Sequence, residues 1–322
     1  MQELVFKIGS RFLEQPLVEI TPILGKGRIN RIFLVQARSK EIVIRLNAFL
    51  STPDALEGYI KEQWCLEQAA SVGVPGPSVL EIGQCDGQAY MIQSRVSGEN
   101  AADILTQKTS VWREIGRYSR LVHDMDLPVG ERGQQELPSG LIGPLSQATS
   151  ERWLQQVQEG IDALSNSQDL LGGFVYPKGQ KDNLIAKFEE LKTLSFRAGL
   201  HHGDLSLKNV MVDQPGSVHL LDWGSALVHN TPYYDLSQML KSQVETNDPD
   251  EEGVLAFLSG YGLSASEGEE ICSRSAIFLL LRTFGKVRWA IDCNHPKASR
   301  FASFAKSLLA RKHAGLAGGS ST

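Results

Sequence analysis

The chain has 322 residues, 42% hydrophobic and 21% charged, which is an ordinary balance for a globular protein. Its net charge of −5, with no block of Lys and Arg, argues against nucleic acid as a partner. The longest apolar run, AIFLLL at 276–281, is too short to span a membrane. The N-terminus lacks a secretory signal pattern and the four cysteines are widely spaced, so we expect a cytoplasmic protein with no membrane partner.

The first ninety residues predict strands interrupted by one helix. The segment 18–24 is rich in β-branched residues and leads into a glycine-containing turn. RIFLVQA (31–37) and EIVIRL (41–46) are joined by a short polar linker, which predicts a hairpin. A hydroxyl, a proline and an acid at 52–54 then open a predicted helix that continues to Ala70.

The pattern changes from strands to helices near residue 100. SVLEIGQ (78–84) and QAYMIQSRV (88–96) predict two further strands. Apolar residues at helical spacing then predict helices at 101–107, 110–125, 150–165 and 182–196, and a largely helical chain from the polar segment near 200–224 to Arg311. The sequence therefore predicts a small strand-rich part followed by a larger helical part.

The strongest chemical signal is LHHGDLSLKNVMV at 200–212, followed by LLDWG at 220–224. Asp204 and Asn209 stand five residues apart, and two short apolar runs flank the turn DQPGS. A hairpin built this way puts Asn209 just before one arm and Asp222 just after the other. An amide oxygen and a carboxylate that converge there suit Mg²⁺, and Asp204 could accept a proton from a hydroxyl.

Simpler readings of the same polar residues remain open. Asp204 and Asn209 could merely satisfy backbone groups of a loop. A zinc site at His201 and His202 is disfavoured, because adjacent positions seldom converge on one ion, and we expect His202 to support the loop by a backbone hydrogen bond. The acidic stretch 245–252 is either a solvated loop or one wall of a site for a cationic substrate.

HGDLSLKN followed by DWG resembles the aminoglycoside phosphotransferase and choline kinase group, relatives of the protein kinases. The resemblance covers about residues 18–125 and 200–262 and involves several separate motifs in the same order. These motifs are LGKGRINRIFLV, EIVIRL, KEQWCLEQAASVGVPGP, AYMIQSRVSGE, SRLVHDM and PYYDLSQML, the last of which places Asp235 where the family has a structural aspartate.

The resemblance implies an α+β, protein-kinase-like two-lobe fold. We expect a nucleotide-binding lobe at 1–94, made of a small antiparallel sheet with one helix. A larger, mainly helical catalytic and substrate-binding lobe would occupy 95–322. Within it, 126–199 would supply the helices of the acceptor site, which vary between family members.

The implied activity is Mg²⁺-dependent transfer of the γ-phosphate of ATP or GTP to a hydroxyl of a small molecule, an EC 2.7.1-type reaction. The acceptor could be an antibiotic, an amino alcohol, a sugar or another metabolite, and we expect a monomer or weak homodimer. The resemblance assigns catalysis to Asp204 and Lys208 and the metal to Asn209 and Asp222. It assigns the nucleotide to Gly25, Gly27, Asn30, Arg45, Glu62, Gln93 and Arg95.

One departure concerns Arg45, which stands where better-known members have lysine. Arginine still binds phosphate through its forked guanidinium, and Glu62 would hold it. A nucleotide-binding regulatory protein without transfer activity is the first alternative. A protein kinase is the second, although Asp235 follows Asp222 by only 13 positions. Residues 128–200 carry nine acids and seven bases, which does not demand a cationic acceptor.

Overall fold

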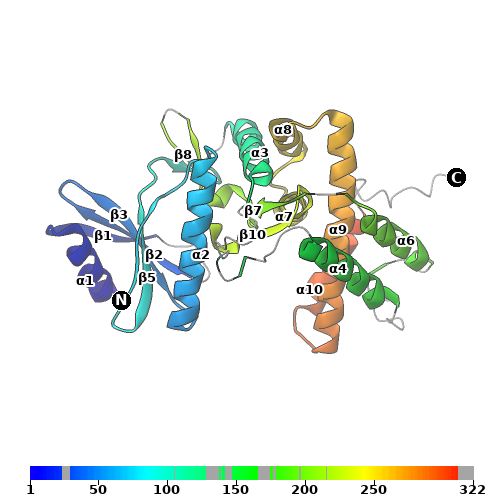
Figure 1. Ribbon diagram of the computed structural model, residues 1–322, viewed down its shortest axis with the longest axis horizontal. Coiled ribbons are helices and arrows are strands. Elements are labelled where there is room, and N and C mark those ends of the chain that lie inside the picture. Colours follow the sequence, from blue (N-terminus) through cyan, green and yellow to red (C-terminus); the bar gives the residue numbers. More distant parts are fainter. Residues whose placement is uncertain are drawn as a thin grey trace. The chain divides into compact units, whose positions relative to one another are not determined.

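The computed structural model describes residues 1–23, 30–104, 106–127, 138, 140–141, 147–165, 175–176, 179–195, 197–214 and 216–310. The chain forms two compact units (Figure 1). The first is built mainly from Met1–Lys108 and Leu207–Leu227, and most of the remaining chain belongs to the second. The proposed lobes 1–94 and 95–322 stay a prediction.

The first unit is built on a five-stranded antiparallel sheet with the strand order β1-β2-β3-β5-β4. The predicted hairpin is β2–β3, and the predicted strand pair at 78–96 is β4–β5. The elements of this part are α1 (Gln2–Leu13), β1 (Leu17–Ile23), β2 (Asn30–Ala37), β3 (Glu41–Asn47), α2 (Thr52–Ser71), β4 (Val79–Cys85) and β5 (Gln88–Ser94).

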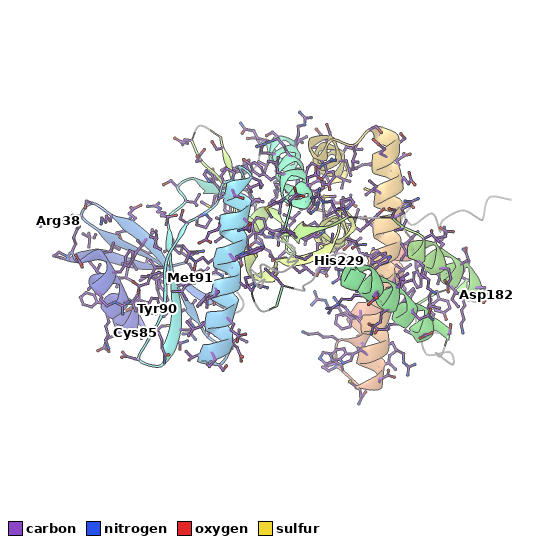
Figure 2. The ribbon with its side chains drawn as sticks, in the orientation of Figure 1. Arg38, Cys85, Tyr90, Met91, Asp182 and His229 are labelled. Carbon is purple, nitrogen blue, oxygen red and sulfur yellow. The ribbon has the colours of Figure 1, made fainter. Side chains whose placement is uncertain are left out.

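Each face of this sheet is buried by a different helix. Successive residues of a strand point to opposite faces, and the buried neighbours Tyr90 and Met91 of β5 accordingly belong to separate clusters (Figure 2). Tyr90 packs with Ile8 of α1. Met91 packs with Tyr59 of α2. The α2 face carries the predicted phosphate-binding cation, because Arg45 is the strand partner of Met91 and projects to the same side.

A second, three-stranded sheet completes the first unit. It consists of β6 (Glu99–Asn100), β8 (Val210–Val212) and β9 (Val218–Leu220), in the order β6-β8-β9. The hairpin predicted around DQPGS is therefore confirmed. The backbone N–H of Leu220 donates to Pro75 O at 2.9 Å and fastens the hairpin to the segment after α2. Gly98 (φ 126°) crosses it so closely that a Cβ there would stand 2.2 Å from Val212 O.

The second unit is mainly helical. Its core includes Phe278 and Phe284 of the long helix α9, which begins with a capping box between Ser264 and Glu267. No helix in the described ranges is long and apolar enough to cross a membrane. The elements are α3 (Lys108–Asp124), α4 (Gln147–Ser165), α6 (Lys181–Lys192), α7 (Tyr233–Thr246), α8 (Glu251–Tyr261), α9 (Ala265–Asp292), α10 (Ala298–Leu309) and the paired strands β7 (Ala198–His201) and β10 (Leu227–Asn230).

The structure differs from the sequence prediction in three places. Helix α1 was not predicted, although it buries Val5 and Ile8 at helical spacing. The described residues of 101–107 begin with a turn rather than a helix, and α3 starts at Lys108. The predicted cap of α2 was the hydroxyl residue Thr52. The cap is instead Ser51, whose hydroxyl accepts from the backbone N–H of Asp54, and Thr52 is the first helical residue.

Candidate active site

The open end of the β8–β9 hairpin brings the backbone of the two predicted metal ligands close together. Asn209 ends a short 3₁₀ turn directly before β8, and Asp222 follows β9 by two residues. The backbone N–H of Leu221 donates to Asn209 O at 2.9 Å. Asn209 therefore lies beside the residue that precedes Asp222, as the predicted hairpin requires.

Arg45 lies between two carboxylates. It is 6% exposed, and its Nη1 pairs with Glu62 Oε1 of α2, while Nη2 lies 3.3 Å from Asp222 Oδ1. Burial by itself lowers the pKa of Arg45, but Glu62 and Asp222 raise it above its ordinary value. The cation is thus permanently charged, and its buried Nε has no hydrogen-bond partner among the described residues.

The donor set beside Arg45 fits a hard divalent cation. Asn209 and Asp222 offer oxygen ligands, and the Asp222 side chain is 44% exposed. Asp222 has left-handed backbone (φ 59°, ψ 68°), which is uncommon for a residue with a side chain and recurs at functional sites. A Cβ on Gly224 would stand 3.4 Å from Asp222 Oδ1 and 3.5 Å from Glu62 Oε2, which are ordinary contact distances, so Gly224 lies directly beside both carboxylates.

Tyr59 of α2 contacts two of the predicted site residues and was not itself predicted from the sequence. Its hydroxyl donates to Asn30 Oδ1 at 3.0 Å and approaches Arg45 O at 3.4 Å. Tyr59 therefore ties the strand that carries the cation to the first residue of β2. Gly25 and Gly27, the predicted phosphate-covering glycines, lie outside the described residues.

Gln93 lies near the end of β5, and Arg95 directly follows the strand. Gln93 is the strand partner of Val43, two positions from Arg45 on the same face of the sheet. It is 5% exposed, and its Nε2 has no hydrogen-bond partner in the described part of the chain. Arg95 instead forms a partly exposed ion pair with Glu41. The two predicted nucleotide ligands thus differ, since only Gln93 presents an unused buried donor.

Asp235 holds the backbone of the loop that carries Asp204. Its carboxylate accepts from the N–H of His202 at 3.1 Å and from the N–H of Gly203 at 2.9 Å. Gly203 has a positive φ of 81°, which turns the chain toward Asp204. The Asp204 N–H donates to His202 Nδ1 at 3.3 Å, so His202 supports the loop as predicted.

His201 joins a buried cluster with His123 of α3 and Asp235, rather than with His202. Asp235 Oδ2 lies 3.2 Å from His123 Nε2 and 3.3 Å from His201 Nδ1, and the ligand atoms of the three residues lie within 4.8 Å of one another. Burial, followed by His201, lowers the pKa of His123 to about 4. Burial raises the pKa of Asp235, but the two histidines reverse this and hold it well below the ordinary value. The cluster fastens α3, β7 and α7 to each other.

The predicted site residues are divided between the two units. Arg45, Asn209 and Asp222 belong to the first, as does Lys208, whose backbone carbonyl accepts from Asn100 Nδ2 at 2.9 Å. Asp204 belongs to the second. The roles assigned to these residues therefore stay predictions.

The acidic stretch 245–252 has local structural partners. Asp250 caps α8 by accepting from the Gly253 N–H at 2.8 Å. Asp248 accepts from the Trp112 indole at 3.4 Å. Glu252 accepts from the Thr109 hydroxyl at 3.2 Å. These contacts show that the acids of this stretch cap a helix and accept local hydrogen bonds. They favour this role over that of an acidic wall for a cationic substrate.

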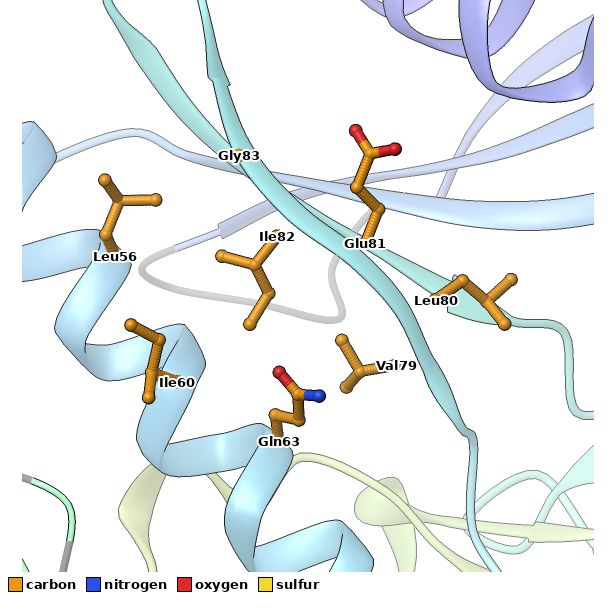
Figure 3. A pocket seen from close by; sticks show the side chains of 8 residues that line it. All are labelled: Leu56, Ile60, Gln63, Val79, Leu80, Glu81, Ile82 and Gly83. Atoms are coloured by element: carbon orange, nitrogen blue, oxygen red, sulfur yellow. The ribbon is translucent and has the colours of Figure 1, made fainter.

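A pocket of about 490 Å³ lies elsewhere on the first unit, between α2 and β4 (Figure 3). Leu56, Ile60 and Gln63 of the helix face Val79 and Ile82 of the strand, a mostly apolar lining. None of the predicted site residues lines it.

Comparison with known proteins gives a family and a fold. The model of the phosphotransferase enzyme family (APH) matches residues 19–271. Hygromycin-B 4-O-kinase of Escherichia coli is 23% identical over 221 residues, which are 65% of this chain and 59% of that relative. The chain therefore matches less than two thirds of the relative's length.

Solved structures resemble the chain over nearly its whole length. A thermostable mutant of aminoglycoside phosphotransferase APH(4)-Ia, in a ternary complex with ADP and hygromycin B, has a TM-score of 0.63 at 16% identity and covers 98% of this chain and 99% of its own. Spectinomycin phosphotransferase APH(9)-Ia, in complex with ADP and spectinomycin, has a TM-score of 0.58 at 14% identity, with coverages of 97% and 98%.

The likeness confirms the predicted α+β, protein-kinase-like fold, and the family model confirms the predicted relationship. The family's members act as phosphotransferases, in agreement with the motifs around Asp204 and Asp222. The chain belongs to the aminoglycoside phosphotransferase family of phosphotransferase enzymes.

Proposed function

We propose that this protein is a Mg²⁺-dependent phosphotransferase that moves the γ-phosphate of ATP or GTP to a hydroxyl of a small molecule. The observation that carries the proposal is Arg45, buried between Glu62 and Asp222. A buried ion pair is weak support for stability, because desolvation of its charges offsets their attraction. Binding of a phosphate would account for a buried cation at this position, since guanidinium groups bind phosphate oxygens with strong, directed hydrogen bonds.

The first unit would hold the nucleotide. Arg45 would grip the phosphates while Glu62 fixes its direction, and the orphaned amide of Gln93 would donate to the base from the same face of the sheet. Asn209 and Asp222 would hold Mg²⁺, which when bound neutralises phosphate charge. Contacts of Gly25, Gly27, Asn30 and Arg95 with the nucleotide belong to the same proposal.

The second unit would supply the group that activates the acceptor. The acceptor oxygen forms a bond to the γ-phosphorus, the bond from that phosphorus to the bridging oxygen breaks, and the hydroxyl proton passes to the Asp204 carboxylate. His202 and Asp235 fix the loop that carries this carboxylate. Lys208 would offset charge on the transferred phosphoryl group. We also propose a cytoplasmic location.

A transfer assay tests the proposal. The full chain is incubated with γ-labelled ATP or GTP and a panel of hydroxylated small molecules, with Mg²⁺ or with chelator. We expect label on at least one acceptor, only with Mg²⁺. Bound nucleotide without turnover on any acceptor would contradict the proposal and favour a nucleotide-binding regulatory protein.

A further inference from the structure

Lys61 of α2 makes a contact that the proposed function does not use. Its Nζ donates to the backbone carbonyl oxygen of Ala226 at 3.1 Å, across 165 positions of the sequence. Both residues belong to the first unit. Ala226 is 1% exposed, so its carbonyl needs a hydrogen-bond partner from within the protein. Lys61 supplies one, and the contact fastens α2 to the segment that follows Asp222.

The segment from Asp222 to Ala226 is a single tight turn. Asp222 opens it in the left-handed backbone conformation (φ 59°, ψ 68°), and Trp223–Ser225 form the 3₁₀ turn itself. The backbone N–H of Ala226 closes it by donating to Trp223 O at 2.9 Å. A residue in a sparsely populated conformation keeps it only where the surrounding structure fixes it. The Lys61 contact contributes to this, because it holds the residue that closes the turn.

Glu62, the next residue of α2, acts on the other end of the same turn. It pairs with Arg45, whose Nη2 lies 3.3 Å from Asp222 Oδ1. Lys61 holds the turn at Ala226 instead. Two adjacent residues of one helix thus restrain the two ends of the turn. The helix that orients the predicted phosphate-binding cation therefore also restrains a predicted metal ligand.

We infer that Lys61 is a positioning residue for the metal site: by holding the carbonyl of Ala226, it keeps the Asp222 carboxylate where it can bind Mg²⁺. The inference rests on the proposed function, in which Asp222 holds Mg²⁺, and deepens it by a residue that acts on the metal only through the turn. Without the contact, the turn has one restraint fewer, so ordering the carboxylate on metal binding costs more. Loss of Lys61 should weaken the Mg²⁺-dependent part of nucleotide binding and spare the part due to Arg45.

Calorimetric titration of the full chain with a non-hydrolysable ATP analogue, in Mg²⁺ and in chelator, tests the inference. The ratio of the two dissociation constants measures what the metal adds to nucleotide binding. Lys61→Met should reduce this ratio by about three- to tenfold, the effect of one hydrogen bond. The dissociation constant in chelator should change by less than about twofold, because Arg45 still meets the phosphates.

Further variants assign the effect to the contact with Ala226. Lys61→Arg should keep most of the ratio, because a guanidinium can donate to the same carbonyl. Gln63→Met is the matched control on α2 and should keep the wild-type ratio. Gln63 bonds to Glu67 within the helix at 2.9 Å and faces the pocket between α2 and β4 (Figure 3).

Nucleotide binding in chelator also reports whether each variant is folded. Where Lys61→Met does not fold, Lys61→Gln takes its place with the same expected loss, because its shorter side chain should not reach the carbonyl of Ala226.

Three results would overturn the inference: a wild-type ratio in Lys61→Met, equal weakening of binding in Mg²⁺ and in chelator, or a loss in Lys61→Arg as large as that in Lys61→Met. Failure of the proposed function gives a different result. If Mg²⁺ does not tighten nucleotide binding by the wild type, the metal site at Asn209 and Asp222 is contradicted, and this inference with it. If Mg²⁺ tightens binding equally in the wild type and in Lys61→Met, only this inference is contradicted.

Discussion

Arg45 is the residue at which stability and nucleotide binding can be separated. Arg45→Met leaves Glu62, which is 2% exposed, as a buried charge without its cation. We expect a loss of about 3–5 kcal/mol in the free energy of unfolding, together with loss of ATP binding. Urea denaturation and calorimetric titration with a non-hydrolysable ATP analogue measure the two effects.

The double variant Arg45→Met, Glu62→Met is the control for that experiment. Replacing a whole buried ion pair by apolar residues of similar size is often neutral or stabilising, so most of the lost stability should return. Nucleotide binding should not return, because no phosphate-binding cation is left. Recovery of both properties in the double variant would show that Arg45 serves only to pair with Glu62.

His123 gives the second unit a dependence on pH that follows from its environment. Its pKa in the folded chain is about 4, below the ordinary value of 6.5. Between these values the unfolded chain binds a proton that the folded chain excludes, so stability falls as the pH decreases from about 6.5 to about 4. The groups that face the ring are Asp235, His201 and Tyr261.

His123→Gln should reduce the slope of this dependence while it keeps a donor near Asp235, and His229, whose pKa burial lowers to about 3, should keep its own contribution. One titrating group contributes a slope of about 1.4 kcal/mol per pH unit in this window. Urea denaturation at several pH values measures the slope for the wild type and the variant. An unchanged slope would mean that another group sets the acid sensitivity.

At the scale of elements, α3 and α8 approach each other through glycines. A Cβ on Gly116 of α3 would stand 2.0 Å from Phe257 O, a backbone atom that cannot move away alone. Gly116→Ala should therefore destabilise the protein by at least about 1–3 kcal/mol. Gly285→Ala on α9, where nothing lies within 4 Å, should stabilise it by about 0.5–1 kcal/mol. Opposite shifts in the Tm of the two variants would confirm the close contact, and equal shifts in Tm would contradict it.

Elements defined by local patterns could be predicted from the sequence. The hairpin at 31–46 follows from two apolar runs around a short polar linker, helix α2 from a hydroxyl, a proline and an acid, and the β8–β9 hairpin from its turn residues. Helix α1 was missed although Val5 and Ile8 have helical spacing. Its glycine and the short length of the pattern weakened the signal.

Tyr59 and Gly224 show what local patterns do not contain. Each matters because of a distance across the fold, from Tyr59 to Asn30 and from Gly224 to the carboxylates of Glu62 and Asp222. Tyr59 and Glu62 stand three residues apart, a spacing that places both on one face of a helix. This spacing was the signal for Tyr59 in the sequence. Their partners could not be inferred without the sheet register.

At the scale of the whole molecule, ordered motifs established the family and the fold but not the acceptor. The motifs near Asp204 and Asp222 lie within one short stretch of sequence, so their chemistry could be read directly. Charge counts over 128–200, nine acids and seven bases, indicate no particular charge for the acceptor.

The most direct measurement of the central claim is the turnover number of Asp204→Ala in the transfer assay, beside the dissociation constant of its Mg²⁺–ATP complex. Asp126→Ala, which removes an exposed carboxylate from the same unit, is the matched control. If Asp204 accepts the proton of the acceptor, turnover falls by about 10²–10⁴-fold while the nucleotide dissociation constant changes little, and the control keeps wild-type activity. Wild-type turnover in Asp204→Ala would contradict the account.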